Sequence, residues 1–486
     1  MTARDPIGGD GVPARPAEVR SPRAARDRPA TFWILVATAV VGPLSSVAGS
    51  AAVEAAAGAL TALVVGGLLA AWGAEVVLGR DRPAFGLKRT WPLVVPFAAA
   101  AAWAAVQALP MTPAAWQHPL WASAAEALGP TPAAAISLAP HQTLTALMRL
   151  LACGGIFWLA LQHGRRSDRA RQIFTAVAYA GLAFALYGLV ARVSGAPPLF
   201  ATAPFAGGDG VGGAFDARNA DAAHTGLALL CSTGLIMVAL GRGIDGAVGG
   251  GERLLRLTDG VGMRQGLLLA SWITLMAALI LGSSREGFLV TILGVALLVL
   301  LLGLVRTVPA RFALAFGLAC AVAAATFSGI GGDRTAAATA AAGVAGSQRA
   351  DIERLTRAAI GTAPLLGTGY DTFEEVFRFH RSAGLGPVRL EDRAVHLEVA
   401  LELGIPAAAM LVAVFGGLLM ITATGVRRRG RDVVYPAIGL TATATVAAHA
   451  VVGVSVQVPA VAVVYCLIMG AACAQSWSSR APDDPW

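Results

Sequence analysis

The chain has 486 residues, of which 56% are hydrophobic and only 14% are charged, and its formal net charge is +8. Soluble globular domains carry about 25% charged residues, so this composition excludes an ordinary soluble domain and predicts a protein embedded in a membrane. The positive charge is almost entirely arginine, because Lys88 is the only lysine.

The first 31 residues are rich in Arg, Pro, Gly and Ala. Such a segment buries no apolar face, so we expect a disordered, basic tail in the cytoplasm. An apolar run begins at Phe32 and is long enough to cross a membrane. No small-x-small cleavage site follows it, so we interpret it as a span and not as a cleaved signal peptide.

Apolar runs of the length that a spanning helix needs, about 20 residues, recur along the rest of the chain. We therefore predict an all-α integral membrane protein with about twelve transmembrane helices. Nine fall in residues 32–330 and three in residues 401–475, with a large loop at 331–400 and a cytoplasmic tail at 476–486. The runs are 32–50, 55–78, 91–109, 142–162, 172–194, 222–240, 265–282, 287–305, 311–330, 401–424, 433–452 and 456–475.

The five cysteines each fall inside an apolar run and form no Cys-x-x-Cys pair, so we interpret them as packing residues. The predicted outer loops contain no Asp-x-Asp sequence and no cluster of neighbouring carboxylates. The sequence therefore predicts neither a metal site nor another cofactor.

Arginine placement predicts the orientation in the membrane. If the N-terminal tail is cytoplasmic, alternate loops should be basic. They are basic at 80–89, 165–171, 242–264, 306–311 and 427–431, whereas the intervening loop 110–141 contains no Lys or Arg. Both termini are therefore predicted to lie in the cytoplasm. Two predicted outer segments break the rule, the turn at Arg285 and the segment 331–400, and an anionic ligand on that side is one explanation.

The segment 331–400 is too long for a simple connector. Its Ala/Thr/Gly-rich part, 335–346, is expected to be mobile. Residues 348–360 have helical periodicity, with Ile352, Leu355 and Ala359 on one face and charged side chains on the other. Two interpretations remain open, namely a solvated surface helix and a helix that lies flat on the membrane.

Several stretches between residues 200 and 460 resemble the O-antigen ligase and O-antigen polymerase superfamily of polytopic membrane glycosyltransferases. In chain order they are Gly213-Ala-Phe-Asp-Ala-Arg218-Asn219, Ser283-Ser-Arg285, Arg349 with Pro364-Leu-Leu-Gly-Thr-Gly-Tyr-Asp-Thr-Phe373, Leu397-Glu398 with Glu402-Leu-Gly-Ile-Pro406, and His449 with Gln457-Val-Pro459. The sequence departs from the family pattern at four positions. Asp216 replaces an Asn, Arg393 and Ala394 replace the family's His-Asn pair, and Gly453 replaces an Asp.

The resemblance implies transfer of a glycan from a polyprenyl-diphosphate carrier at the periplasmic face of a bacterial inner membrane, without a metal or another cofactor. The leaving diphosphate develops negative charge, which fixed arginines stabilise in a forked geometry. Arg285 and Arg349 are the candidates for this role. The alternatives are a snorkelling interfacial Arg285 and a solvated Arg349.

A sugar hydroxyl acceptor needs a general base, and a neutral histidine suits this task. His396 lies three residues after the place where the family has its histidine, and we predict that it is catalytic. The alternative is a structural histidine at a helix start. Candidates for substrate binding, implied by the same resemblance, are Arg218, Asn219, Arg357 and His449, although the turn at Arg218 and Asn219 is also consistent with a simple helix cap.

The expected partners are a lipid-linked glycan donor, a lipid-core or glycan acceptor and membrane lipids, and no nucleic acid. We favour a ligase, with a polymerase of lipid-linked repeat units or transfer to a protein as alternatives. A transporter or flippase is a second class of function. Such proteins carry ionisable residues near the middle of the membrane, whereas here only Arg149 lies well inside a predicted span.

Overall fold

The computed structural model describes residues 29–42, 51–80, 83–129, 134–194, 218–244, 263–282, 285–329, 336–380, 393–430, 432–453 and 457–477. These ranges contain helices, turns and no strand, which confirms the predicted all-α class. Of the predicted tails, 1–31 and 476–486, residues 1–28 and 478–486 lie outside the described residues. The turn that precedes Arg218 also lies outside them.

Eleven of the described helices are long and apolar enough to cross a membrane. They coincide with the second to the twelfth predicted run, so the chain has the helices of a multi-pass membrane protein. They are α2 (Ala51–Val77), α3 (Leu87–Ala108), α5 (Pro140–His163), α6 (Ser167–Ser194), α7 (Arg218–Ile244), α9 (Met263–Gly282), α10 (Arg285–Leu304), α11 (Ala310–Gly329), α15 (Ile405–Arg428), α16 (Val434–Val452) and α17 (Pro459–Ser476).

The first predicted span is represented by α1 (Pro29–Val41), which has 13 residues. That length is short of the roughly 20 residues that a crossing helix needs. Residues 43–50, the second part of the predicted span, lie outside the described ranges. A twelfth crossing therefore stays a prediction.

The remaining helices lie in the segments that join the membrane-length helices. They are η2 (Ala114–Trp116), α4 (Leu120–Leu128), α12 (Ala336–Thr362), α13 (Phe373–His380) and α14 (Val395–Leu403). α12 begins at Ala336, so it includes most of the 335–346 stretch, whose expected mobility stays a prediction. Alanine has the highest intrinsic helix propensity, and the alanine-rich stretch extends the predicted amphipathic helix by several turns.

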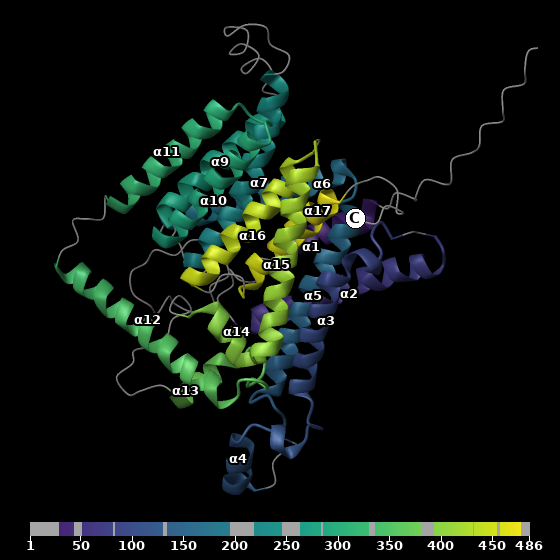
Figure 1. Cartoon of the computed structure of the whole chain (residues 1–486), viewed down its shortest axis with the longest axis vertical. Coiled ribbons are helices and arrows are strands. Elements are labelled where there is room, and N and C mark those ends of the chain that lie inside the picture. The colour runs from purple at the N-terminus through teal and green to yellow at the C-terminus, as the bar shows by residue number, and fades with distance from the viewer. Residues whose placement is uncertain are drawn as a thin grey trace, which may run out of the picture.

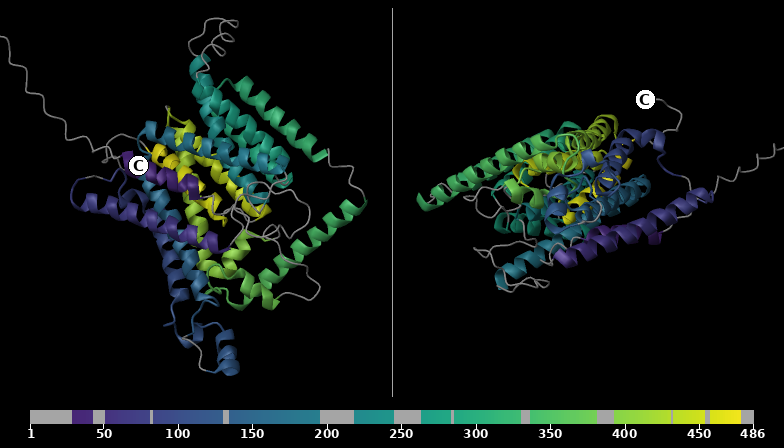
Figure 2. Two further views of the ribbon diagram at one scale, coloured as in Figure 1. Left: turned by 180° about the vertical axis from the view of Figure 1, so that it is seen from behind. Right: turned by 90° about the horizontal axis from the view of Figure 1, so that it is seen from below.

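The long helices form one bundle, with α7, α10, α16 and α17 inside and α2 and α11 at its surface (Figure 1). Most residues of α7 and α17 are buried, whereas few residues of α2 and α11 are buried. Figure 2 shows the purple-blue α2 running along the outside of the bundle. Helices that are apolar on all sides and exposed in this way are suited to contact with lipid.

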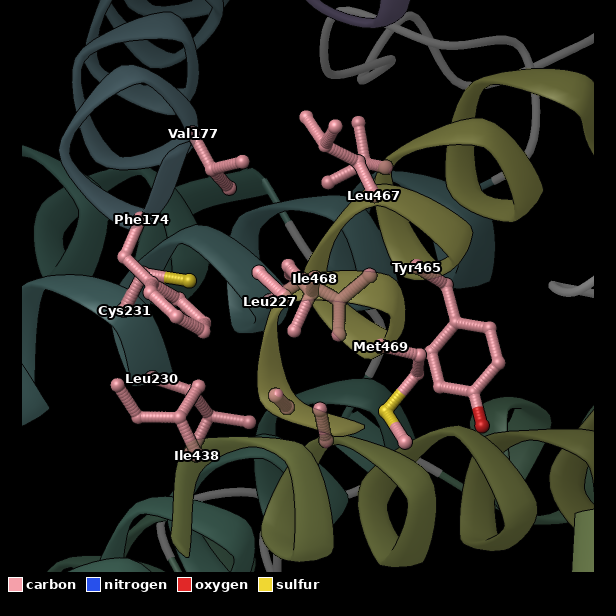
Figure 3. Close-up of a cluster of buried hydrophobic side chains, with 14 of the residues drawn as sticks. Phe174, Val177, Leu227, Leu230, Cys231, Ile438, Tyr465, Leu467, Ile468 and Met469 are labelled. Carbon is pink, nitrogen blue, oxygen red and sulfur yellow. The ribbon is translucent and has the colours of Figure 1, made fainter. Parts of the chain in front are cut away.

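Apolar side chains from four of the helices meet at the centre of the core. Phe174 of α6, Leu230 of α7, Ile438 of α16 and Ile468 of α17 all point into the same cluster (Figure 3). In lipid the hydrophobic effect does not drive helices to associate, because lipid tails are as apolar as the side chains. Close packing at small residues holds the helices together instead. Gly470 of α17 is such a residue, because its α-carbon lies directly against the backbone of α5.

Replacement of Gly470 by alanine is expected to destabilise the bundle. A Cβ there would lie 2.5 Å from the Phe157 carbonyl oxygen and 3.0 Å from the Leu161 nitrogen, and neither backbone atom can move independently. Overpacking of this kind costs about 1–3 kcal/mol. Thermal unfolding of the purified protein in detergent should show a lower midpoint for Gly470→Ala.

The matched control is Gly66→Ala in α2, where a Cβ would have no neighbour within 4 Å. This variant should unfold at or above the wild-type temperature, because alanine has the higher helix propensity. Equal midpoints for Gly470→Ala and Gly66→Ala would contradict the close α5–α17 contact.

Candidate functional site

The predicted site residues lie at one end of the bundle, where α7 and α10 begin and α9 and α16 end. We call it the α14 end, because α12, α13 and α14 also lie there (Figure 1). The Thr291 hydroxyl of α10 lies 3.4 Å from the Ala222 carbonyl oxygen of α7 and 3.4 Å from Nε2 of His449 in α16. These contacts join α7 and α10, which begin at Arg218 and Arg285, to His449 of α16.

Arg349 joins α12 to the end of α16. Its guanidinium donates a hydrogen bond of 2.6 Å to the carbonyl oxygen of Val451, and its Nε lies 3.6 Å from Oε1 of Glu353. The side chain is 28% exposed. Arg349 therefore contacts the last turn of α16 at Val451, a residue that follows His449 by two positions. It is not a freely solvated helix residue.

His449 is completely buried in the bundle. Its Nε2 contacts Thr291, and its Nδ1 is a buried atom without a hydrogen-bond partner among the described residues. The structure thus places this predicted substrate-binding residue inside the helix bundle, about one turn from the end of α16. A substrate at the surface of the α14 end would be separated from the ring by protein.

Arg285 and His396 are both exposed. Arg285 is the first residue of α10, six residues before Thr291, which corresponds to about 9 Å along a helix. His396 is the second residue of α14. Glu398, two residues later, is buried, so the two side chains project from opposite faces of α14.

The other predicted residues are less closely associated with this group. Arg357 is exposed on α12 and forms an ion pair of 2.8 Å with Glu353, two turns from Arg349. α7 begins at Arg218, but the side chains of Arg218 and Asn219 lie outside what the structure describes. Their proposed role in substrate binding stays a prediction.

The glycine-rich stretch 364–373 wraps around the junction between α14 and α15. The N–H groups of Thr368 and Gly369 donate to the Glu402 carbonyl oxygen at 3.1 and 3.0 Å, and the N–H of Ile405 donates to the Pro364 carbonyl oxygen at 2.9 Å. Gly367 has a φ of 69°, and a Cβ there would collide with the Glu402 carbonyl. The conformation requires glycine, so this part of the motif holds the site in place.

Arg393 is the centre of a charged cluster beneath this turn. Only 8% of its side chain is exposed. Its guanidinium lies 2.6 Å from Oε1 of Glu374 and 3.4 Å from Oε1 of Glu398, and 4.8 Å above the ring of Phe373. Arg393 is thus a buried cation that joins α13 to α14.

Two buried carboxyl groups on α14 have raised pKa values. Burial is the main cause for Glu398, whose pKa rises to about 7 although the Arg393 charge opposes the shift. Burial and the charge of Glu398 raise the pKa of Glu402 well above its usual value, and Asp371 adds to both effects. A carboxyl group of this kind can hold or release a proton near neutral pH.

Carboxylates that are not clustered along the sequence lie close together in the folded chain. Glu374, Glu398 and Glu402 come from separate positions in the sequence and meet only when α13 packs on α14. The available signal was the spacing of Glu398 and Glu402, four residues apart in an apolar helix, which puts both on one face. Among the described residues no group of three or more His, Cys, Asp or Glu is arranged to hold a metal ion.

The stability of the protein should fall with rising pH because of Glu398. Its ionisation is favoured in the unfolded chain, near the ordinary value of 4.5, and is opposed in the folded chain until about pH 7. The contribution of Glu398 to the free energy of unfolding is therefore fully present below pH 4.5 and is lost as the pH rises through about 7. Thermal midpoints measured between about pH 5 and about pH 8 should decline less steeply in Glu398→Gln than in the wild type.

Arg393→Gln provides the opposite change at the same cluster. Loss of the neighbouring cation should move the pKa of Glu398 further upward and shift the decline to higher pH. Identical pH profiles for wild type, Glu398→Gln and Arg393→Gln would show that this cluster does not titrate as described.

No model of a known protein family matches this chain. A search of curated proteins finds no significant match either. What the protein does has to be inferred from its own residues and their geometry.

Proposed function

We propose that the protein is a membrane glycosyltransferase that transfers a glycan from a polyprenyl-diphosphate carrier to an acceptor, in the manner of an O-antigen ligase. The observation that supports this proposal best is the arrangement at the α14 end. Arg349 contacts the end of α16, where His449 is buried against Thr291, and Arg285 begins the helix that carries Thr291. Segments more than 150 residues apart in the chain contribute to this group.

The charges of this end suit a lipid-linked diphosphate donor. The carrier lipid stays in the membrane, so its phosphates lie at the level of the helix ends. Arg285 is exposed at the first residue of α10, where the helix dipole also favours an anion. Arg349 is partly exposed on α12 and contacts the end of α16. Two arginines at this level stabilise the charge that develops on a leaving diphosphate.

The acceptor hydroxyl requires a base that a substrate can reach. His396 satisfies this condition, because its side chain is exposed on α14. His449 does not, because it is enclosed in the bundle. In this proposal His396 removes the hydroxyl proton as the hydroxyl attacks the anomeric carbon. The bond from that carbon to the diphosphate then breaks, and the electron pair leaves with the phosphate.

In the proposed orientation the α14 end lies on the outer, non-cytoplasmic side of a bacterial inner membrane. The opposite end of the bundle carries Arg427 and Arg428 in the last turn of α15 and Arg165 and Arg166 after α5. A concentration of arginine at that end is the pattern of a cytoplasmic face. Both termini would then be cytoplasmic, and the glycan donor would be used after its transfer across the membrane.

Transfer by the purified full-length protein in nanodiscs should depend on the exposed arginines and on His396. With polyprenyl-diphosphate glycan and a lipid-core acceptor, Arg285→Ala and Arg349→Ala should each lower the rate about 10²-fold or more. His396→Ala should lower it by about 10²–10⁴-fold, the range for loss of a general base. Product formation by gel mobility and mass spectrometry provides the measurement.

Arg354→Ala is the matched control on α12, because Arg354 is exposed and pairs only with Asp351 of the same helix among the contacts described. It should retain the wild-type rate. Full activity of His396→Ala would contradict its role as the base. An absence of transfer with every acceptor, together with solute movement across proteoliposomes, would favour a transporter instead.

The acceptor distinguishes a ligase from a polymerase. A ligase should attach the glycan only when the lipid core is present. A ladder of products from the donor alone would instead identify a polymerase of lipid-linked repeat units. Because the arginines act on the donor in both reactions, their variants should be impaired in either case.

A further inference from the structure

Arg149 is a charged residue inside the apolar helix α5. It is nine residues from the first residue of α5, which corresponds to about 13 Å along a helix. α5 is one of the helices long and apolar enough to span a membrane. A charged side chain at such a position is costly in lipid and usually has a functional partner.

The partners of Arg149 in the protein satisfy its guanidinium only in part. NH1 lies 4.0 Å from Oδ2 of Asp371, at the outer limit of an ion pair, and 55% of the Asp371 side chain is exposed. Nε of Arg149 is buried and has no hydrogen-bond partner among the described residues. The Arg149 side chain is 28% exposed, so its outer N–H groups, which have only this distant carboxylate as a partner, retain capacity for an anion with several acceptor oxygens.

The neighbouring helix α2 packs closely on this side chain. Gly58 of α2 is the residue opposite Arg149, and a Cβ built there would contact Nε at 3.5 Å. Little of α2 is buried, and the helix lies at the surface of the bundle beside α5 (Figure 2). A lipid next to α2 and α5 would thus be adjacent to the part of the Arg149 side chain, 28%, that is exposed.

We propose that Arg149 binds a phosphate group of a lipid that lies against α2 and α5. This inference rests on the proposed function for the identity of the lipid, a polyprenyl diphosphate. A phosphate provides the oxygens that Asp371 does not, and arginine binds phosphate through two parallel N–H groups. Asp371 competes with the phosphate for the same guanidinium.

Asp371 also connects this site to the cluster on α14. Its charge raises the pKa of Glu398, Glu402 and Tyr370, so its carboxylate lies close enough to act on all three groups. Its φ is 65°, a left-handed conformation that asparagine tolerates about as well as aspartate. Asp371→Asn is therefore a substitution that removes the charge and keeps the backbone.

The test is lipid binding by the purified full-length protein, measured by native mass spectrometry with polyprenyl diphosphate that carries no glycan. Arg149→Gln should weaken binding at least tenfold. Asp371→Asn should tighten it severalfold, because the competing carboxylate is gone. Gly58→Leu keeps both charges but crowds the Arg149 side chain at Nε, and it should weaken binding as well.

Arg166→Gln, at the opposite end of the bundle, is the control and should bind as the wild type does. Thermal midpoints show whether each variant is folded. If Arg149 were only half of a structural ion pair, Arg149→Gln and Asp371→Asn would lower the midpoint alike and leave binding unchanged, which would overturn the proposal. Opposite effects of these two variants on binding support it.

A parallel titration with phosphatidylglycerol distinguishes the source of the phosphate. Selective loss of polyprenyl diphosphate binding in Arg149→Gln supports the carrier as the ligand. Equal loss of both lipids supports a phosphate site but contradicts its assignment to the carrier. Because binding is measured without transfer, a failure of the proposed glycosyltransferase activity leaves this result interpretable.

Discussion

The backbone junction between the turn at 367–369 and the end of α14 determines the geometry of the whole α14 end. Lipid offers no hydrogen bonds, so the carbonyl groups at a helix end need partners within the protein. The Glu402 carbonyl oxygen accepts from Thr368, Gly369 and the side chain of Gln107. This one oxygen thereby joins α3, the glycine-rich turn and α14. The glycine-rich turn also places Tyr370 and Asp371 beside Glu402, and it brings Phe373 beneath Arg393.

Helical segments were predictable from the sequence because the bilayer imposes their length and apolar composition. The positions at which the helices begin and end were less predictable. The apolar pattern of 348–360 identified α12 but not its start at Ala336, since alanine carries no amphipathic signal.

The site could be predicted only in part, because its residues interact across the fold. Arg349 was identified from its motif, but its bond to the Val451 carbonyl depends on how α12 lies against α16. Burial of His449 depends on the packing of α7, α10 and α16, which no local pattern records. The ion pairs of Arg393 join positions 19 and five residues away, so neither its burial nor its partners follow from helix periodicity.

α14 has two chemically different faces, and this arrangement links proton binding to the position of the helix. His396 is exposed on one face, while Glu398 and Glu402 are buried on the other with raised pKa values. A rotation of α14 that exposed Glu398 would lower its pKa and release a proton, and it would also separate the carboxylate from Arg393. Protonation of Glu398 therefore stabilises the buried arrangement, in which His396 is exposed on the opposite face of α14.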